Sequence, residues 1–295
     1  MRIASLLPAA TEIVGALGLA DDLVAVTFEC DRPEGIRATR PVVVDTALPA
    51  GLTPGEIDRI VRERAARDLP QYDLDREALR DAAPDLVLTQ DLCRVCALPA
   101  STVADALDAL DLDATVLTVD PHTLDEVLDA IAGVATAAGA PDAGTVLLET
   151  LQDRLATVDR AVAGMPRPRV LALEWVDPPF LPGHWVPAMV RRAGGEPIAG
   201  IDGGRSVATT WEQIAEDQDP DLVLVAPCGF GLADAVAQAS AVRGQLPNTP
   251  IVAVDSASYV VRAGPRLVDG IEAIAHALHP DAVPAPPPGR ITVLS

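Results

Sequence analysis

Four cysteines follow predicted strands of this sequence, at the positions where α/β proteins usually present ligand-binding side chains. Cys30 ends the run 26–30, Cys93 and Cys96 form a C-x-x-C pair, and Cys228 stands between Pro and Gly. A C-x-x-C pair with two distant thiols can supply four sulfur ligands to zinc or to an iron–sulfur cluster. The same thiols could instead form a redox pair or simply fill the core, and the sequence leaves these alternatives open.

A second candidate group is a run of aromatic residues at 174–185. Trp175, Phe180, His184 and Trp185 lie within it, although aromatic residues make up only 3% of the chain. Rings on a loop that follows a strand predict a flat, largely apolar ligand held by ring faces. The alternative is that the two tryptophans fill the core of their lobe. His184 could bind a metal or cap a helix.

Other residues at the ends of predicted strands complete the predicted ligand-binding set. That set is Pro8, Glu29, Cys30, Trp175, Phe180, His184, Trp185 and Phe230. The chain has no G-x-G-x-x-G, Walker or G-x-S-x-G motif, so the usual devices for nucleotide binding and serine hydrolysis are missing. No catalytic residue is predicted.

The elements that must position these residues alternate between strand and helix. Apolar runs predict strands at 2–8, 23–27, 42–44, 86–89, 115–119, 169–173, 221–225 and 251–254. Helices are expected at 11–18, 54–68, 101–110, 123–138, 185–193 and 265–278. This alternation is typical of parallel sheets covered by helices.

The two halves of the chain repeat one another. Pro-Asp-Leu-Val-Leu occurs at 84–88 and again at 220–224, each time after an acidic helix and shortly before a cysteine. Between the halves, apolar residues spaced by three and four predict one long helix over 142–163. We therefore predict two Rossmann-like α/β lobes, at 1–140 and 166–280, joined by a rigid helix at 141–165, with a ligand cleft between the lobes. The Pro-rich tail at 281–295 is expected to be an extended strap or a disordered end.

Charge and length limit the possible partners. The 295 residues include 43 acidic and 22 basic side chains, a net charge of −21, which excludes nucleic acid and anionic membrane surfaces. No uncharged apolar run reaches the roughly 18 residues of a membrane span, so membrane insertion is not expected. The apolar stretch before Pro8 is too short for the core of a signal peptide, and a cytoplasmic location is expected.

Several segments together resemble the cobalamin-binding members of the helical-backbone (class III) solute-binding proteins of ABC importers. The segments are the residues 5–18, 31–33, 84–88, 177–180 and 193–195, and the resemblance covers about residues 2–278. The resemblance implies two α/β lobes, a rigid connecting helix and a corrinoid or metal chelate in the cleft. It also implies that Glu77 and Glu212 dock on arginines of an ABC permease. An additional stretch at 47–73 is expected to act as a lid.

The leading hypothesis is thus a non-catalytic binding protein for cobalamin or a related corrinoid, with no cofactor required for folding. The alternative is a metalloprotein in which Cys30, Cys93, Cys96 and Cys228 hold zinc or an iron–sulfur cluster. A third possibility, an enzyme that acts on corrinoids or tetrapyrroles, has only an analogy of fold behind it.

Overall fold

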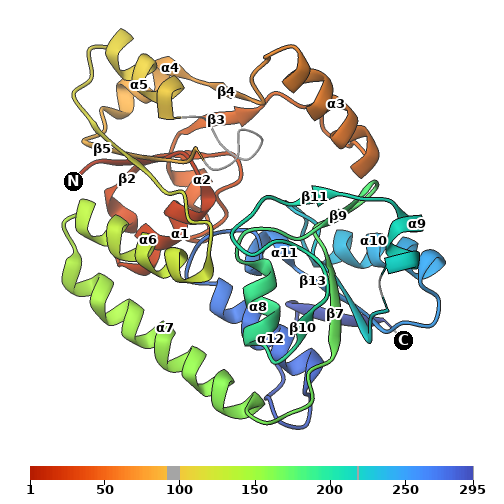
Figure 1. Cartoon of the computed structure of the whole chain (residues 1–295). Helices are drawn as coiled ribbons and strands as arrows, with labels where there is room; N and C mark the ends of the chain where they lie inside the picture. Colours follow the sequence, from red (N-terminus) through yellow and green to blue (C-terminus); the bar gives the residue numbers. More distant parts are fainter. Residues whose placement is uncertain (92–99, 218, 295) are drawn as a thin grey trace. The chain divides into compact units, whose positions relative to one another are not determined.

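The computed structural model describes residues 1–91, 100–217 and 219–294 (Figure 1). The chain forms two compact units. The first comprises Met1–Pro121 and Val127–Glu149, and the second comprises His122–Glu126 and Thr150–Ser295. Both units are α/β, as predicted, and cysteines 93 and 96 lie outside the described residues.

The first unit is built on a six-stranded sheet with the order β4-β3-β2-β1-β5-β6. The strands are parallel except β4, which pairs antiparallel with β3. Their bounds are β1 Ile3–Ser5, β2 Leu23–Thr27, β3 Val42–Thr46, β4 Tyr72–Leu74, β5 Leu86–Thr89 and β6 Thr115–Thr118. The central strands β1 and β5 are buried along their whole length because helices cover a parallel sheet on both faces.

The helices of this half of the chain follow the strands that they connect. They are α1 Pro8–Ala16, the 3₁₀ turn η1 Ala20–Asp22, α2 Ile36–Thr39, α3 Pro54–Ala66, α4 Arg76–Ala82, α5 Ala100–Ala109 and α6 Leu124–Ala137. Helix α3 lies within 47–73, the stretch expected to act as a lid, and begins with a capping box. The Thr53 hydroxyl accepts from the backbone N–H of Glu56, and the Glu56 carboxylate accepts from the backbone N–H of Thr53.

The second unit has a five-stranded sheet, β10-β7-β12-β13-β14, and a small three-stranded sheet, β11-β9-β8. The strands are β7 Arg169–Leu173, β8 Trp175–Val176, β9 Pro179–Leu181, β10 Glu196–Pro197, β11 Val207–Ala208, β12 Leu222–Val225, β13 Ile251–Val254 and β14 Ile291–Leu294. The helices are α8 Val186–Arg192, α9 Trp211–Asp217, α10 Leu232–Gln245, α11 Ser256–Tyr259 and α12 Leu267–Leu278.

The long helix predicted between the halves is α7, Pro141–Val162. Its apolar stripe is buried at Leu151, Leu155, Val158 and Val162. The boundary between the two units falls inside this helix, between Glu149 and Thr150. None of the helices in the described ranges is long and apolar enough to cross a membrane.

The C-terminal tail contains a strand that was not predicted from the sequence. Residues Ile291–Leu294 form β14, which pairs antiparallel with β13 at the edge of the five-stranded sheet. Leu294 packs against the buried cluster of this sheet. Edge pairing and apolar burial order these four residues as an extended strand, so the disordered end is the alternative that the structure contradicts.

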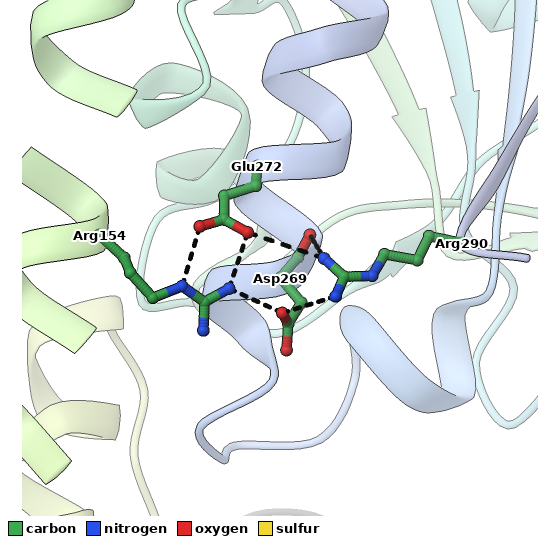
Figure 2. A network of polar contacts seen from close by, with 4 residues as sticks. All are labelled: Arg154, Asp269, Glu272 and Arg290. Carbon is green, nitrogen blue, oxygen red and sulfur yellow. Dashed lines mark hydrogen bonds and ion pairs between the residues drawn. The ribbon is translucent and has the colours of Figure 1, made fainter. Parts of the chain in front are cut away.

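A network of four charged side chains ties α7, α12 and the segment before β14 together within the second unit (Figure 2). Arg154 donates from Nε to Glu272 at 2.9 Å, and from Nη2 to Asp269 and to Glu272, both at 2.7 Å. Arg290 lies 2.9 Å from the same Asp269 oxygen. Hydrogen bonds to Glu272, and then to Asp269, raise the pKa of Arg154.

We expect Arg154→Met to lower the free energy of unfolding by about 1 to 2 kcal/mol, because two partly buried carboxylates then share only Arg290. The side chain of Arg154 is 34% exposed, so solvent screening keeps the effect below that of a fully buried pair. The matched control is Arg59→Met, which breaks the exposed Arg59–Glu63 pair of α3 and should cost less than about 0.5 kcal/mol. Urea denaturation followed by circular dichroism measures both, and equal losses would contradict the prediction.

Candidate functional site

Three aromatic rings gather at the carboxyl ends of β7 and β12 in the second unit. Trp175 lies in β8 directly after β7, and Phe180 stands opposite it in the β8–β9 pairing. Phe230 follows β12, and its ring centroid lies 5.4 Å from that of Trp175, at an interplanar angle of 51°. All three side chains are partly exposed. We call Trp175, Phe180 and Phe230 the aromatic cluster.

Glu174 holds the backbone that carries this cluster. Its carboxylate accepts from the N–H of Gly183 at 3.1 Å and from the hydroxyl of Ser206. Its own N–H donates to the carbonyl of Phe180, and its carbonyl accepts from the N–H of Cys228 at 2.9 Å. One residue at the end of β7 thus fixes the loops on either side of the rings.

Trp185 lies only ten residues from Trp175, yet the structure places it differently. It is 5% exposed, and its indole Nε1 donates to the carbonyl of Val260 at 2.7 Å. A buried tryptophan whose N–H is satisfied by a backbone carbonyl is a packing residue. The ring therefore fills the core of the second unit and offers no open face to a ligand.

His184 is half-buried and sits in a left-handed backbone conformation, with φ of 48°. The backbone N–H of His184 donates to the carbonyl of Gly204 at 2.6 Å. Within the described part of the chain its buried Nε2 has no hydrogen-bond partner, and the His122 ring lies 6.1 Å away. Burial lowers the pKa of His184 first, and the charges of His122 and Arg205 lower it further.

This lowered pKa predicts a pH dependence of stability. The unfolded chain binds a proton at His184 near the ordinary value of 6.5, whereas the folded chain binds it only at lower pH. Above pH 6.5, His184 therefore does not lower the free energy of unfolding. Below pH 6.5 the free energy of unfolding falls as the pH drops, by at most about 1.4 kcal/mol for each pH unit. His184→Asn should flatten this slope, because Asn does not titrate and tolerates the left-handed backbone. Thermal unfolding of both proteins between pH 5 and 8 measures the difference, and parallel slopes would exclude His184 as the source.

In the first unit, the predicted residues Pro8, Glu29 and Cys30 do follow β1 and β2. Pro8 is the first residue of α1, and Glu29 is partly exposed. Cys30 is 1% exposed, and its Sγ lies 3.0 Å from the Thr11 hydroxyl. A thiol buried in this way is an interior hydrogen-bonding group, so it does not fit the predicted role in ligand binding.

Sequence reasoning did not select one ring pair of the first unit. Phe28 follows β2 and lies 6.3 Å from Tyr72 of β4, between ring centroids. Both side chains are partly exposed. Phe28 stands two residues before Cys30, so the rule that residues after strands matter could have identified it.

The cysteines that the structure describes do not form a metal site. Cys30 is buried in the first unit, and Cys228 is exposed in the second. Among the described residues, no group of three or more His, Cys, Asp and Glu side chains is placed to hold a metal ion. The four-cysteine alternative therefore gains no support here, and its other two members lie outside the described residues.

Glu77 and Glu212 occupy similar local positions in the two units. Each is exposed in the first turn of a short helix, Glu77 in α4 and Glu212 in α9. The backbone N–H of Glu212 and the hydroxyl of Thr210 lower the pKa of Glu212. Both side chains are therefore open to a partner at the surface.

Comparisons with known proteins find a matching family model and solved structures of the same fold. A family model described as "Periplasmic binding protein" matches residues 3–257. No curated protein matches the chain. A periplasmic heme-binding protein, RhuT from Roseiflexus sp. RS-1, is 23% identical, with 95% of this chain and 98% of that chain covered and a TM-score of 0.70.

Two further solved structures have the same fold. A periplasmic heme-binding protein from Pseudomonas aeruginosa is 20% identical, covers 100% of this chain and 98% of that one, and gives a TM-score of 0.71. The periplasmic vitamin B12-binding protein BtuF of Vibrio cholerae is 23% identical, with 94% and 96% covered and a TM-score of 0.64. At these sequence identities the similarity establishes the fold, and the ligand must be inferred from the residues of the site.

Proposed function

The chain belongs to the family of periplasmic binding proteins, so it is a non-catalytic solute-binding protein, and we propose that its solute is a corrinoid, with cobalamin as the candidate ligand. The aromatic cluster carries this proposal. The similarity to a vitamin B12-binding protein of the same fold supports it.

The chemistry of the cluster suits a large, flat ring. Trp175 and Phe230 present tilted faces to one another at 5.4 Å, and Phe180 adds a third ring from the neighbouring strand. Partly exposed rings on a fixed backbone lose little conformational entropy on binding and bury a large apolar area. A corrin ring offers that apolar area, and its polar substituents can remain in water.

Titration with hydroxocobalamin tests the proposal, with the corrin absorption bands as the readout. We expect binding at micromolar concentration with a shift of these bands. Absence of binding together with an unchanged spectrum would reject the corrinoid.

Heme is a second candidate, because an exposed thiol stands beside the cluster. Cys228 lies two residues before Phe230 and is exposed, and a cysteine thiolate is an axial ligand of heme iron. Structures of the same fold include heme-binding proteins. Titration with hemin distinguishes the two ligands: if heme is the solute, hemin binds more tightly than hydroxocobalamin, and Cys228→Ser changes the Soret band.

The proposed partner is an ABC permease, docked through Glu77 and Glu212. Each carboxylate is exposed at the first turn of a helix in its own unit, where it can meet an arginine of the partner. In a binding assay with the purified permease of the same organism, the double variant Glu77→Arg, Glu212→Arg should lose association. Unchanged association would remove both residues from the docking surface.

A further inference from the structure

The second unit contains a cavity of about 590 Å³ that shares no residue with the aromatic cluster. Its walls come from the end of α7, the loop between α7 and β7, helix α8 and the first residues of α6. All of the lining residues belong to the second unit. The volume is within the range of about 300 to 1,000 Å³ that is usual for small-molecule sites.

Three of the 22 arginines of this acidic chain line the cavity: Arg167, Arg191 and Arg192. Arg192 is held by Asp159 through two contacts, from Nε at 3.2 Å and from Nη2 at 2.8 Å. Arg191 pairs with Asp202 at 2.8 Å. Two of the three guanidinium groups are thus fixed in position by carboxylates.

Arg167 is bonded differently. Its Nη1 donates to the carbonyls of Arg191 and Gly195, at 3.1 and 3.2 Å, and within the described ranges no carboxylate pairs with it. Two backbone carbonyls orient the guanidinium but leave its positive charge uncompensated. The remaining carboxylate of the wall, Asp125, is exposed in the first turn of α6, where the helix dipole favours a negative charge.

Apolar side chains form most of the rest of the wall, together with Thr123 and Gly164. Val162 and Leu124 are 7% and 6% exposed, and Ala188 of α8 is partly exposed. Met165, at 37%, is one of the large apolar side chains left exposed among the described residues. A flexible thioether at the wall of a cavity can adapt to an apolar ligand.

We propose that this cavity binds a small amphiphilic carboxylate, with the carboxylate on Arg167 and the apolar body against Met165, Val162 and Leu124. A guanidinium with remaining N–H donors matches a carboxylate in shape and charge. On a surface with a net charge of −21, the guanidinium of Arg167, which is held by backbone carbonyls, is also a positive charge that a small anion can approach. The site is separate from the proposed corrinoid site and does not depend on it.

Isothermal titration calorimetry of the full chain with sodium octanoate tests the proposal, with octanamide as the neutral probe of the same length. Octanoate should bind at least tenfold more tightly than octanamide. Arg167→Gln, which removes the charge, and Met165→Trp, which fills the cavity, should each weaken octanoate binding at least tenfold. The matched control is Arg59→Gln on the exposed face of α3, which removes one positive charge outside the cavity and should leave binding unchanged.

Three results would overturn the proposal. Equal binding of octanoate and octanamide would show that the charge is not recognised. Octanoate binding that survives both cavity variants would place the site elsewhere. Inorganic phosphate that binds as tightly as octanoate would show a simple anion site without an apolar subsite. Hydroxocobalamin titration of Arg167→Gln separates the two sites, because its outcome should equal that of the unmodified chain.

Discussion

Gly270→Ala should destabilise the second unit by about 3 kcal/mol, which is unusual for the addition of one methyl group. Gly270 lies in the middle of α12 and is buried. A Cβ atom at this position would stand 2.0 Å from the carbonyl oxygen of Tyr259 and 3.1 Å from Cε of Met189. The oxygen belongs to the backbone of α11, so it cannot rotate away as a side chain would, and α11 and α12 must separate.

The matched control is the same substitution at Gly244 in α10, also in the second unit. A Cβ atom at Gly244 would meet nothing within 4 Å. Alanine there should raise the free energy of unfolding by about 0.5 to 1 kcal/mol, because it reduces the conformational freedom of the unfolded chain. All three tryptophans belong to the second unit, so urea denaturation followed by tryptophan fluorescence measures both variants in the unit that carries them. Similar stabilities for the two variants would show that α11 can move away from α12 at little cost.

The regular part of this fold could be predicted because its periodicity is strong. The apolar runs at 86–89 and 251–254 are fully buried strands, and the stripe at 142–163 is one long helix. Helix α10 was not predicted. Its sequence is dominated by alanine and has few large apolar residues, so it shows no clear apolar stripe, although it packs on the second sheet.

The small sheet of β8, β9 and β11 could not be predicted, although it carries two of the three rings of the aromatic cluster. Its strands are two or three residues long, too short to show an alternating pattern. Hydrogen bonds from distant residues create it: the carboxylate of Glu174 accepts from Gly183 and Ser206, and β11 pairs with β9.

The sequence did not predict which of the candidate residues are buried. Trp175 and Trp185 are ten residues apart in the sequence, and one is partly exposed while the other is buried. The difference depends on Val260, which accepts the hydrogen bond of Trp185 from 75 residues away. The same holds for Cys30, because the hydroxyl of Thr11 that contacts its thiol belongs to a different element.

If the aromatic cluster binds a corrinoid, Trp175→Ala should weaken hydroxocobalamin binding by about 30-fold, or about 2 kcal/mol. Trp175 is the central ring of the cluster, because Phe230 contacts it directly and Phe180 stands opposite it in the strand pairing. Its removal takes away a ligand-facing ring and also the support of its two neighbours. Trp175→Phe should recover most of the affinity, since a smaller aromatic face remains. Absorption titration of the corrin bands measures each dissociation constant.

The matched control for this prediction is Trp211→Ala in the same unit. Trp211 begins α9 and packs against the buried cluster of the five-stranded sheet, so its loss should lower stability and leave the affinity for hydroxocobalamin unchanged. Trp175→Ala should show the reverse pattern, because Trp175 is partly exposed and its indole N–H donates to the carbonyl of Asp177, two residues away. Comparing affinity with thermal stability in the two variants separates ligand contact from packing. A Trp175→Ala protein that is folded and binds hydroxocobalamin normally would place the corrin ring away from the aromatic cluster.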